Sequence, residues 1–518
     1  MTSTLSNDPD MPSEPDGPLA AIDMGSNSFR LELAQVQQGR YRRLDYLKET
    51  VRLGGGLTRD GMLTEEAMQR GLTCLERFAG RLRGFSPLRV RAVATQTLRE
   101  AQNRNAFLAR AEQALGFPIE VISGREEARL IFAGVARLQP SELPRLVIDI
   151  GGRSTEMILG RGARSLQAES FQIGSVSLSM KYFADGQLTE SAFRHAQIAA
   201  GAELEEALVP FAPVHWKEAL GSSGTVGALS QVLQAHGITD GRITPASLQW
   251  VIRQCLKAGH VSKLEFSGLK EDRRAVIAGG VSILYTLTSQ FGIDELLPAR
   301  GALRQGVIFD LNERLAAEGR PQDVQDIRDA SVGDLQSRFG IDVPQAQRVM
   351  AVAGALHAQL EPGNPPSRAV NEARRELLWA AALHEIGMMI SHHDHHRHSA
   401  YVMTNVDAPG FSQSQQRRLG MLLLAQRGGL RKVETGLADA VAARQVLCLR
   451  LAVIICHARS DLRQQALRLQ APPNEATVQI RYPGDWVPVH PRTWHLLNEE
   501  VSAWSRTQAL HLELVEKP

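Results

Sequence analysis

Residues 19–36 read LAAIDMGSNSFRLELAQV. In this stretch an apolar run ends at Asp23, a turn of small polar residues follows, and alternation of apolar and polar residues resumes at Phe29. Alternation is typical of a half-buried strand, and a cluster of Gly, Ser and Asn is typical of a turn. The stretch therefore predicts a strand, a tight turn and a second strand.

A second copy of this pattern lies further along the chain, where residues 146–159 read LVIDIGGRSTEMIL. Aligning the copies pairs Asp23 with Asp149 and Gly25 with Gly151. The spacing of the two copies is much longer than the period of a solenoid repeat. The pattern therefore indicates an internal duplication of a whole α/β half.

Each predicted turn has the chemistry of a phosphate site. A tight Gly/Ser turn presents backbone N–H groups, and hydroxyl side chains add further donors. The Asp at each strand end can hold a metal through water or orient a nucleophile. One such turn alone is equally compatible with a plain hairpin and a solvated Asp. Two copies facing each other across a cleft favour phosphate binding.

The segments around the two copies divide the chain into an α/β part and a helical part. Strand and helix signals alternate up to about residue 300, and capping-box spacings at residues 97–100 and 123–126 each predict the start of a helix. From about residue 309 long helical periodicity dominates. Strand-like and helix-like patterns mix again from residue 476, which predicts a small α+β segment.

Composition excludes several classes of protein. The 518 residues are 43% hydrophobic and 22% charged, and their net charge is only +2, so the chain is neither disordered throughout nor a polycation that binds nucleic acid by bulk charge. Its 4 cysteines show no CxxC spacing, which fits a reducing cytoplasm. No apolar run approaches about 18 residues, so we expect no transmembrane segment. The acidic, proline-rich residues 1–17 predict a disordered leader.

Three motifs together resemble the exopolyphosphatase / guanosine pentaphosphate phosphatase family, within the superfamily of actin, sugar kinases and heat-shock ATPases. They are AIDMGSNSF (21–29), ISGREEARL (122–130) and VIDIGGRSTE (147–156), with further matches in ALRQGV (302–307), LHEIG (383–387) and HSAY (398–401). The resemblance covers nearly the whole chain from Leu19. It implies duplicated actin-like (ribonuclease-H-like) α/β halves, a helical HD-like domain and a C-terminal α+β segment.

The resemblance also implies a general base. Members of the family use a glutamate of their Ser-Gly-x-Glu-Glu-Ala segment to activate water, and this glutamate maps onto Glu127. We expect Ser123 to cap the helix and the carboxylate of Glu126 to be tied back to that cap. Glu127 then points into the cleft, where we expect the helix dipole to keep it ionised.

Metal and phosphate ligands follow from the same resemblance. We expect Asp149 to bind Mg²⁺, Glu156 to assist, and Asp23 to be the symmetric candidate. The expected phosphate-binding residues are Asn27, Ser28, Arg99, Gly151, Gly152, Ser154 and Thr155. A solvated helix charge is the alternative interpretation of Arg99.

The sequence departs from the family pattern at two positions. Arg153 stands where the family usually has the third glycine of Gly-Gly-Gly-Ser-Thr, and Gln305 stands where it has glutamate. If the backbone at Arg153 needs a positive φ, the arginine is strained; otherwise its guanidinium adds a phosphate contact. Gln305 loses a charge at a position that we interpret as structural.

Two groups of polar residues in the helical part are each compatible with more than one role. A histidine cluster suggests a second metal site, but the adjacent pair is His384–Glu385 instead of the His-Asp pair of metal-dependent phosphohydrolases; its members are His384, His392, His393, His395, His396 and His398. The alternatives are an inert remnant domain and a polar, partly cationic surface for substrate and dimer contacts. Several basic residues could line a path for a long polyanion or form a solvated face: Arg397, Arg417, Arg418, Arg431 and Lys432.

We therefore predict an exopolyphosphatase that uses Glu127 and Mg²⁺. The alternatives are a guanosine pentaphosphate 5′-phosphohydrolase and a non-catalytic nucleotide- or polyphosphate-binding regulator. We expect a cytoplasmic homodimer, and leave open a peripheral position on the inner face of the cell membrane. The expected boundaries are 1–17 for the leader, 18–136 and 137–308 for the two actin-like halves, 309–470 for the HD-like domain and 471–518 for the C-terminal segment.

Overall fold

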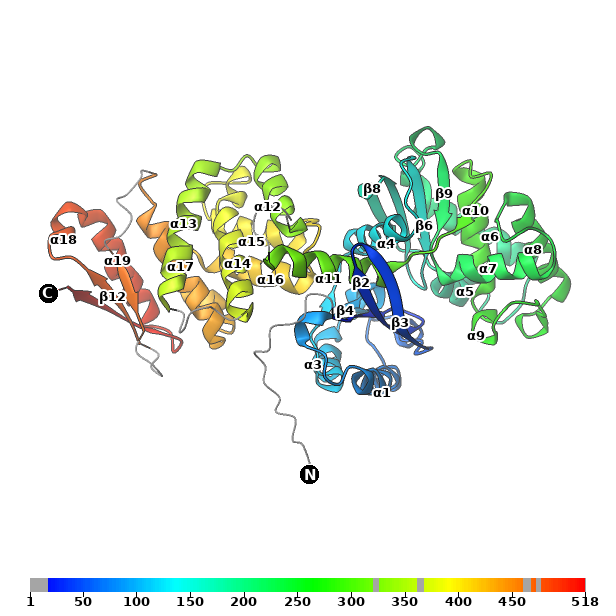
Figure 1. The fold of residues 1–518 in the computed structure, drawn as a ribbon, viewed down its shortest axis with the longest axis horizontal. Coiled ribbons are helices and arrows are strands. Elements are labelled where there is room, and N and C mark those ends of the chain that lie inside the picture. The colour runs from blue at the N-terminus through cyan, green and yellow to red at the C-terminus, as the bar shows by residue number, and fades with distance from the viewer. Residues whose placement is uncertain (1–16, 320–325, 361–367, 460–466, 472–476, 518) are drawn as a thin grey trace, which may run out of the picture. The chain divides into compact units, whose positions relative to one another are not determined.

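The computed structural model describes residues 17–319, 326–360, 368–459, 467–471 and 477–517. The chain forms two compact units, residues 1–325 and 326–518 (Figure 1). The first unit contains both copies of the duplicated pattern. Most of the leader predicted over residues 1–17 lies outside the described residues.

The first sheet is built around the first copy of the pattern. Its strands run in the order β3-β2-β1-β4-β5, where β1 pairs antiparallel with β2 and parallel with β4. Because β1 is central, all of its side chains are buried, the carboxylate-bearing Asp23 included. The elements are β1 (Leu19–Met24), β2 (Phe29–Gln37), β3 (Arg40–Glu49), α1 (Glu65–Arg81), β4 (Val90–Ala94), α2 (Gln96–Glu100), α3 (Arg104–Leu115), β5 (Ile119–Val121) and α4 (Gly124–Leu138).

The second sheet has the order β10-β9-β6-β7-β8. With β6 matched to β1, the two sheets have the same strand order, and β6 pairs antiparallel with β7 and parallel with β9. The elements are β6 (Arg145–Ile150), β7 (Thr155–Arg161), β8 (Arg164–Phe171), α5 (Ser175–Tyr182), α6 (Glu190–Leu204), β9 (Glu218–Gly221), α7 (Gly224–Ala235), α8 (Pro245–Ala258), α9 (Glu271–Arg274), α10 (Ile277–Gln290) and β10 (Leu297–Pro298).

Helix α11 (Leu303–Gly319) packs along α4 in the first unit. Their shared core includes Leu130, Val135 and Val307, all buried. The backbones of the two helices approach closely at Gly306, where an added Cβ would lie 1.7 Å from the carbonyl oxygen of Leu130. The boundary that we expected at residue 309 falls inside α11, whose buried residues join the core of the α/β unit.

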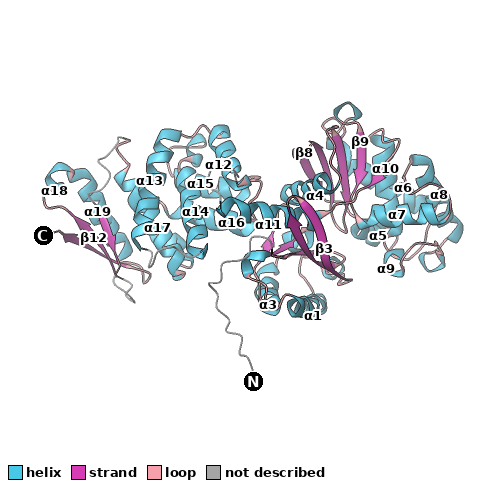
Figure 2. Cartoon of the chain, in the orientation of Figure 1, coloured by secondary structure: helices cyan, strands magenta, loops and turns pink. Residues whose placement is uncertain are grey.

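The second unit is mainly helical, as Figure 2 shows, with a small three-stranded sheet. One core of buried apolar side chains joins its helices to that sheet. The elements are α12 (Ile327–Arg338), α13 (Val343–Leu360), α14 (Arg368–Ala382), α15 (His395–Asn405), α16 (Gln413–Ala425), α17 (Ala440–Ile455), β11 (Arg468–Gln470), β12 (Thr477–Tyr482), α18 (Trp486–Val489), α19 (Pro491–Trp504) and β13 (His511–Glu516). Among the residues that the structure describes, no helix combines the length and apolar character that a membrane span requires.

Short 3₁₀ helices complete the two units: Gly54–Gly56, Pro87–Arg89, Glu205–Ala207, Pro213–His215, Val261–Lys263, Ile386–Met389, Leu430–Val433 and Gly436–Ala438.

One of the two predicted capping boxes is wrong. Helix α2 already begins at Gln96, so Thr97 lies inside it, and the Thr97 hydroxyl donates to the Ser26 hydroxyl at 2.7 Å instead of capping. The other is correct in its first half, because the Ser123 hydroxyl accepts from the backbone N–H of Glu126 at 3.1 Å. Spacing alone does not identify a cap when a tertiary partner is available for the hydroxyl.

Candidate active site

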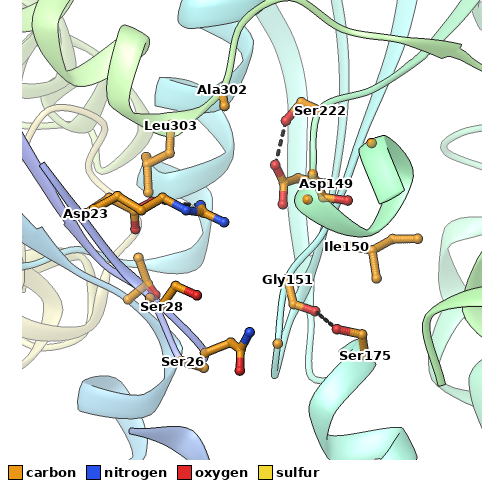
Figure 3. A pocket seen from close by; sticks show the side chains of 18 of the residues that line it. Asp23, Ser26, Ser28, Asp149, Ile150, Gly151, Ser175, Ser222, Ala302 and Leu303 are labelled. Atoms are coloured by element: carbon orange, nitrogen blue, oxygen red, sulfur yellow. Dashed lines mark hydrogen bonds and ion pairs between the residues drawn. The ribbon is translucent and has the colours of Figure 1, made fainter. Parts of the chain in front are cut away.

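A cavity of about 340 Å³ lies between the two hairpin turns of the first unit. Asp23 and Asp149 face it from opposite walls, and Ser26, Ser28 and Gly151 line it below them (Figure 3). The turns approach closely: a Cβ at Gly152 would lie 3.1 Å from the Cβ of Ser26. The duplicated motifs are therefore brought together at one site.

The first turn supplies unpaired donors. The side-chain amide nitrogen of Asn27 and the hydroxyl of Ser28 are buried, and neither has a hydrogen-bond partner within the described protein. Leaving a buried donor unpaired costs roughly 1–3 kcal/mol. An oxyanion bound in the cavity would satisfy both groups.

The second turn supplies a different set. Gly151, Gly152 and Ser154 line the cavity, as expected. Thr155 is wholly buried and its hydroxyl donates to the backbone carbonyl of Ile173 at 2.6 Å, so that hydroxyl has a structural partner. Three of the four residues predicted here are therefore placed to meet a ligand.

The cavity is also lined by cationic side chains that the sequence analysis did not single out. They come from β2, β3, α11 and the segment around α9, and they are Arg30, Lys48, Lys270, Arg273 and Arg304. Two of them hold Asp23, with Arg30 Nη1 at 3.2 Å and Arg304 Nη1 at 3.3 Å from its Oδ2. The only sequence signal for any of them was the 302–307 motif, which contains Arg304.

Glu127 enters the cavity from the first turn of α4. Its Oε2 accepts from Arg99 Nη1 at 2.8 Å. Arg99 also donates to Gln96 Oε1 from Nε at 2.9 Å and to the carbonyl oxygen of Ile122 at 3.0 Å. Arg99 is thus placed against Glu127, which differs from the direct phosphate contact that we expected.

Burial raises the pKa of Glu127 to about 7, Arg99 opposes this shift, and the charges of Asp23 and Asp149 add to it. We expected the helix dipole to keep this carboxylate ionised. The dipole acts over the first turn only and is worth about 0.3–1 kcal/mol at exposed sites, so desolvation outweighs it. A group with this pKa can exchange a proton near neutral pH, which is what a general base requires.

The neighbouring Glu126 has a different environment. Its two carboxylate oxygens accept from Arg129 Nε and Nη2, both at 2.8 Å, and Arg91 Nη2 lies 3.8 Å away. We expected the cap to hold this carboxylate, whereas the structure pairs it with an arginine one turn further along α4. Of the two glutamates, Glu127 lines the cavity and Glu126 does not, so Glu127 stays the proposed base.

The three predicted metal ligands differ in their surroundings: Asp23 and Asp149 line the cavity, and Glu156 does not. Asp149 and Glu156 are paired across β6 and β7, and Asp149 accepts from the hydroxyl of Ser222. Burial raises the pKa of Asp149, with a further contribution from Asp23, and burial together with the charges of Glu127 and Asp149 raises the pKa of Glu156 well above its ordinary value. A cation would relieve this accumulation of negative charge.

Hard carboxylate oxygens suit Mg²⁺, which is commonly held by one or two carboxylates, water and substrate phosphates. Among the described residues no group of three His, Cys, Asp or Glu side chains forms a complete metal site, in this cavity or around His384 and His395. Asp149 fits an incomplete Mg²⁺ site best, because the carboxylate of Asp23 is already paired with two arginines.

Arg153 occupies its turn without backbone strain. Positive φ angles occur among described non-glycine residues at Gln38, Arg52, Asp394 and Arg459, a set that excludes Arg153. Its guanidinium contacts Glu100, with Nε at 3.0 Å and Nη2 at 2.6 Å from Oε2. Backbone strain at Arg153, the first of the two outcomes that we considered, is therefore absent. The Arg153 side chain instead reaches the carboxylate of Glu100 on α2.

The fold and the cleft define an α/β protein in which the hairpin turns of two sheets line one polar cavity beside a buried carboxylate. The chain belongs to the Ppx/GppA phosphatase family, whose model matches residues 33–315, and the model of that family's domain III matches residues 327–501.

Solved structures agree with this assignment. The crystal structure of an exopolyphosphatase from Cytophaga hutchinsonii is 26% identical, with a TM-score of 0.53, and the match covers 57% of this chain and 98% of that one. The crystal structure of an exopolyphosphatase-like protein is 25% identical, with a TM-score of 0.52, and the match covers 59% of this chain and 100% of that one. Family and relatives together support a phosphohydrolase.

Proposed function

We propose that this protein is an exopolyphosphatase, which releases orthophosphate from the end of an inorganic polyphosphate chain. The observation that supports this most is the position of Glu127, a buried carboxylate beside a cavity lined by unpaired hydrogen-bond donors and by cations. A terminal phosphate needs those donors, and its hydrolysis needs a base for the attacking water.

The chain's own residues divide this work. The amide of Asn27, the hydroxyls of Ser28 and Ser154, and the two glycines of the second turn hold the terminal phosphate. Arg30 and Arg304, which both pair with Asp23, supply positive charge to the cavity. Glu127 accepts a proton from water as the water oxygen attacks phosphorus, the bridging P–O bond breaks, and the shortened chain leaves with the bridging oxygen.

Mg²⁺ near Asp149 would neutralise charge that develops on the phosphoryl oxygens. Glu156 would support Asp149 from the neighbouring strand. Asp23 would keep its two arginines in place.

The same cavity suits a second substrate, guanosine pentaphosphate, because its 5′ end is also a phosphoanhydride. A non-catalytic regulator that binds nucleotide or polyphosphate is the third candidate, and the buried base argues against it.

We infer in addition that the α/β unit consists of two actin-like halves, that the second unit is an HD-like domain, and that the protein is a cytoplasmic homodimer. Apart from the boundary at residue 309, which falls inside α11, the domain boundaries given above remain proposals of the same kind.

Orthophosphate release from long-chain polyphosphate and from guanosine pentaphosphate, measured side by side with and without Mg²⁺, tests these proposals. We expect turnover of both, faster on polyphosphate, and little turnover after chelation of the metal. Faster release from guanosine pentaphosphate would reverse the ranking. Binding of both substrates without release would support the regulator.

A further inference from the structure

A continuous series of hydrogen bonds joins the second phosphate-binding turn to the proposed base. It begins at Arg153, between β6 and β7, whose Nε and Nη2 donate to Glu100 Oε2 at 3.0 and 2.6 Å. Glu100 is the last residue of α2, in the other half of the unit. The contact therefore crosses between the halves that carry the two phosphate-binding turns.

The series continues within α2. Gln96 Nε2 donates to Glu100 Oε1 at 2.6 Å, while Gln96 Oε1 accepts from Arg99 Nε at 2.9 Å. The amide is thus held between a carboxylate and a guanidinium, which permits only one orientation of its nitrogen and oxygen. Arg99 Nη1 then donates to Glu127 Oε2 at 2.8 Å.

The path of the Arg153 side chain is shaped by Gly54. A Cβ at Gly54 would lie 3.0 Å from Arg153 Cδ, and the Gly54 carbonyl oxygen is 3.4 Å from Arg153 Nη1. The glycine leaves room for the arginine to cross between the halves. Arg153 and Glu100 keep only 21% and 27% of their side-chain surface exposed, so their contact is largely shielded from solvent.

We propose that Arg153 is a positioning residue for Glu127. It anchors Glu100, which orients Gln96, and that amide holds the guanidinium of Arg99 against the base. This role rests on the proposed function of Glu127. The resemblance places a glycine at this position, so the contact is a feature of this chain and not of the family's turn.

Removing Arg153 should loosen the contacts that follow it in the series, from Glu100 to Glu127. Without Arg153, Glu100 is held by one neutral amide and gains rotamer freedom. The guanidinium of Arg99 then keeps the backbone carbonyl of Ile122 but loses the fixed amide oxygen of Gln96, and the Glu127 carboxylate samples orientations that do not face the attacking water. Substrate binding should change little, because the residues that line the cavity are left in place, whereas turnover depends on the geometry of the base.

The test compares R153G, R153K, E100Q and the double variant R153G/E100Q, assayed on long-chain polyphosphate below their melting temperatures. R242G is the matched control: Arg242 is a loop arginine in the same unit with two carboxylate partners, Asp240 and Glu295, at 3.0 and 2.9 Å. We expect R153G to lower kcat at least about fivefold with KM within about twofold, because one positioning contact is lost. R153K should recover part of the loss, and R242G should keep wild-type kcat.

The double variant decides whether the two residues act as one unit. If they do, R153G/E100Q loses no more than the worse single variant. Losses that multiply, or an unchanged kcat in R153G, would overturn the proposal. If R153G does not fold, E100Q alone must show the selective loss of kcat. A wild-type enzyme that releases no phosphate, or an E127Q variant with full activity, would overturn the proposed function instead.

Discussion

At the scale of single residues, the site depends on one carboxylate subject to opposing influences. Burial and the charges of Asp23 and Asp149 favour the protonated form of Glu127, while Arg99 favours the ionised form. The resulting pKa of about 7 means that small changes nearby alter the fraction of active base. Such a group is expected at a catalytic site more than in a purely structural core.

The first prediction concerns the chemistry of Glu127. E127Q keeps the size and hydrogen-bonding reach of the side chain but cannot accept the proton from water, so we expect kcat to fall about 100-fold or more. Binding of polyphosphate, measured by equilibrium titration, should persist. E126Q is the control, because Glu126 is paired with Arg129. It should lower the melting temperature and keep turnover, and the reverse pattern would transfer the role to Glu126.

The second prediction concerns pH. The base is active when deprotonated, and its pKa is raised to about 7, so kcat/KM should increase with pH and reach half of its plateau near pH 7. Activity is lost on acidification because a protonated Glu127 cannot accept a proton from water. R99Q removes a cation that lowers this pKa, so its profile should move to higher pH. A profile that is flat through neutral pH would contradict the assignment.

At the scale of elements, the close packing of α4 and α11 positions the proposed base relative to one of the cations of the cavity. Helix α4 carries Glu127 and α11 carries Arg304, so their separation determines the distance between base and cation. The approach depends on two glycines: a Cβ at Gly134 would lie 2.4 Å from the carbonyl oxygen of Ala302, and one at Gly306 only 1.7 Å from that of Leu130. Neither backbone oxygen can rotate away as a side chain could.

The third prediction tests this packing. G306A should force the helices apart, lower stability by about 1–3 kcal/mol or more, and reduce kcat as well, because overpacking shifts the backbone. G80A is the matched control, since Gly80 is also helical and its added Cβ meets nothing within 4 Å. G80A should be neutral or slightly stabilising in a denaturant titration. Equal stability of the two variants would show that α11 adjusts without cost.

At the scale of the whole molecule, the question is what the helical unit adds. Lys432 is one of the basic residues that could meet a long polyanion, and burial together with the charges of Arg450 and Arg397 lowers its pKa to about 8. A polyanion nearby would offset that repulsion. Arg418, in contrast, already pairs with the buried Glu376, its Nε lying 3.0 Å from the carboxylate.

The fourth prediction is a truncation that ends at residue 325. It keeps α11 complete, whereas a cut after Leu311 would remove Arg314, which pairs with Asp310 at 2.6 Å. We expect turnover of short chains to persist, and KM for long chains to increase with a flatter salt dependence, because fewer phosphates are contacted. A circular dichroism melt must first show a folded fragment. An unchanged KM on long chains would show that the helical unit contributes to stability and not to substrate binding.

The local sequence pattern was enough to predict the elements on which the site is built. The hairpins at Asp23 and Asp149 and the helix start at Ser123 were predictable, because a turn or a cap depends on residues adjacent in sequence. The capping box at Thr97 failed for the opposite reason: its hydroxyl has a partner in Ser26, far away in the chain. The boundary expected at 309 missed that α11 belongs with the α/β core, since periodicity shows that a helix exists but not where it packs.

By itself the sequence determined the duplicated hairpins, their aspartates and small residues, and Glu127 at a helix start, because each of these is written in adjacent residues. Only the tertiary structure decided which charges meet: the arginines on Asp23, the contact of Arg99 with Glu127, and the bridge from Arg153 to Glu100. It also decided the direction of the Glu127 pKa, because that shift comes from burial and from carboxylates on distant segments. Desolvation and Coulomb interactions depend on distance in space, which a linear pattern does not contain.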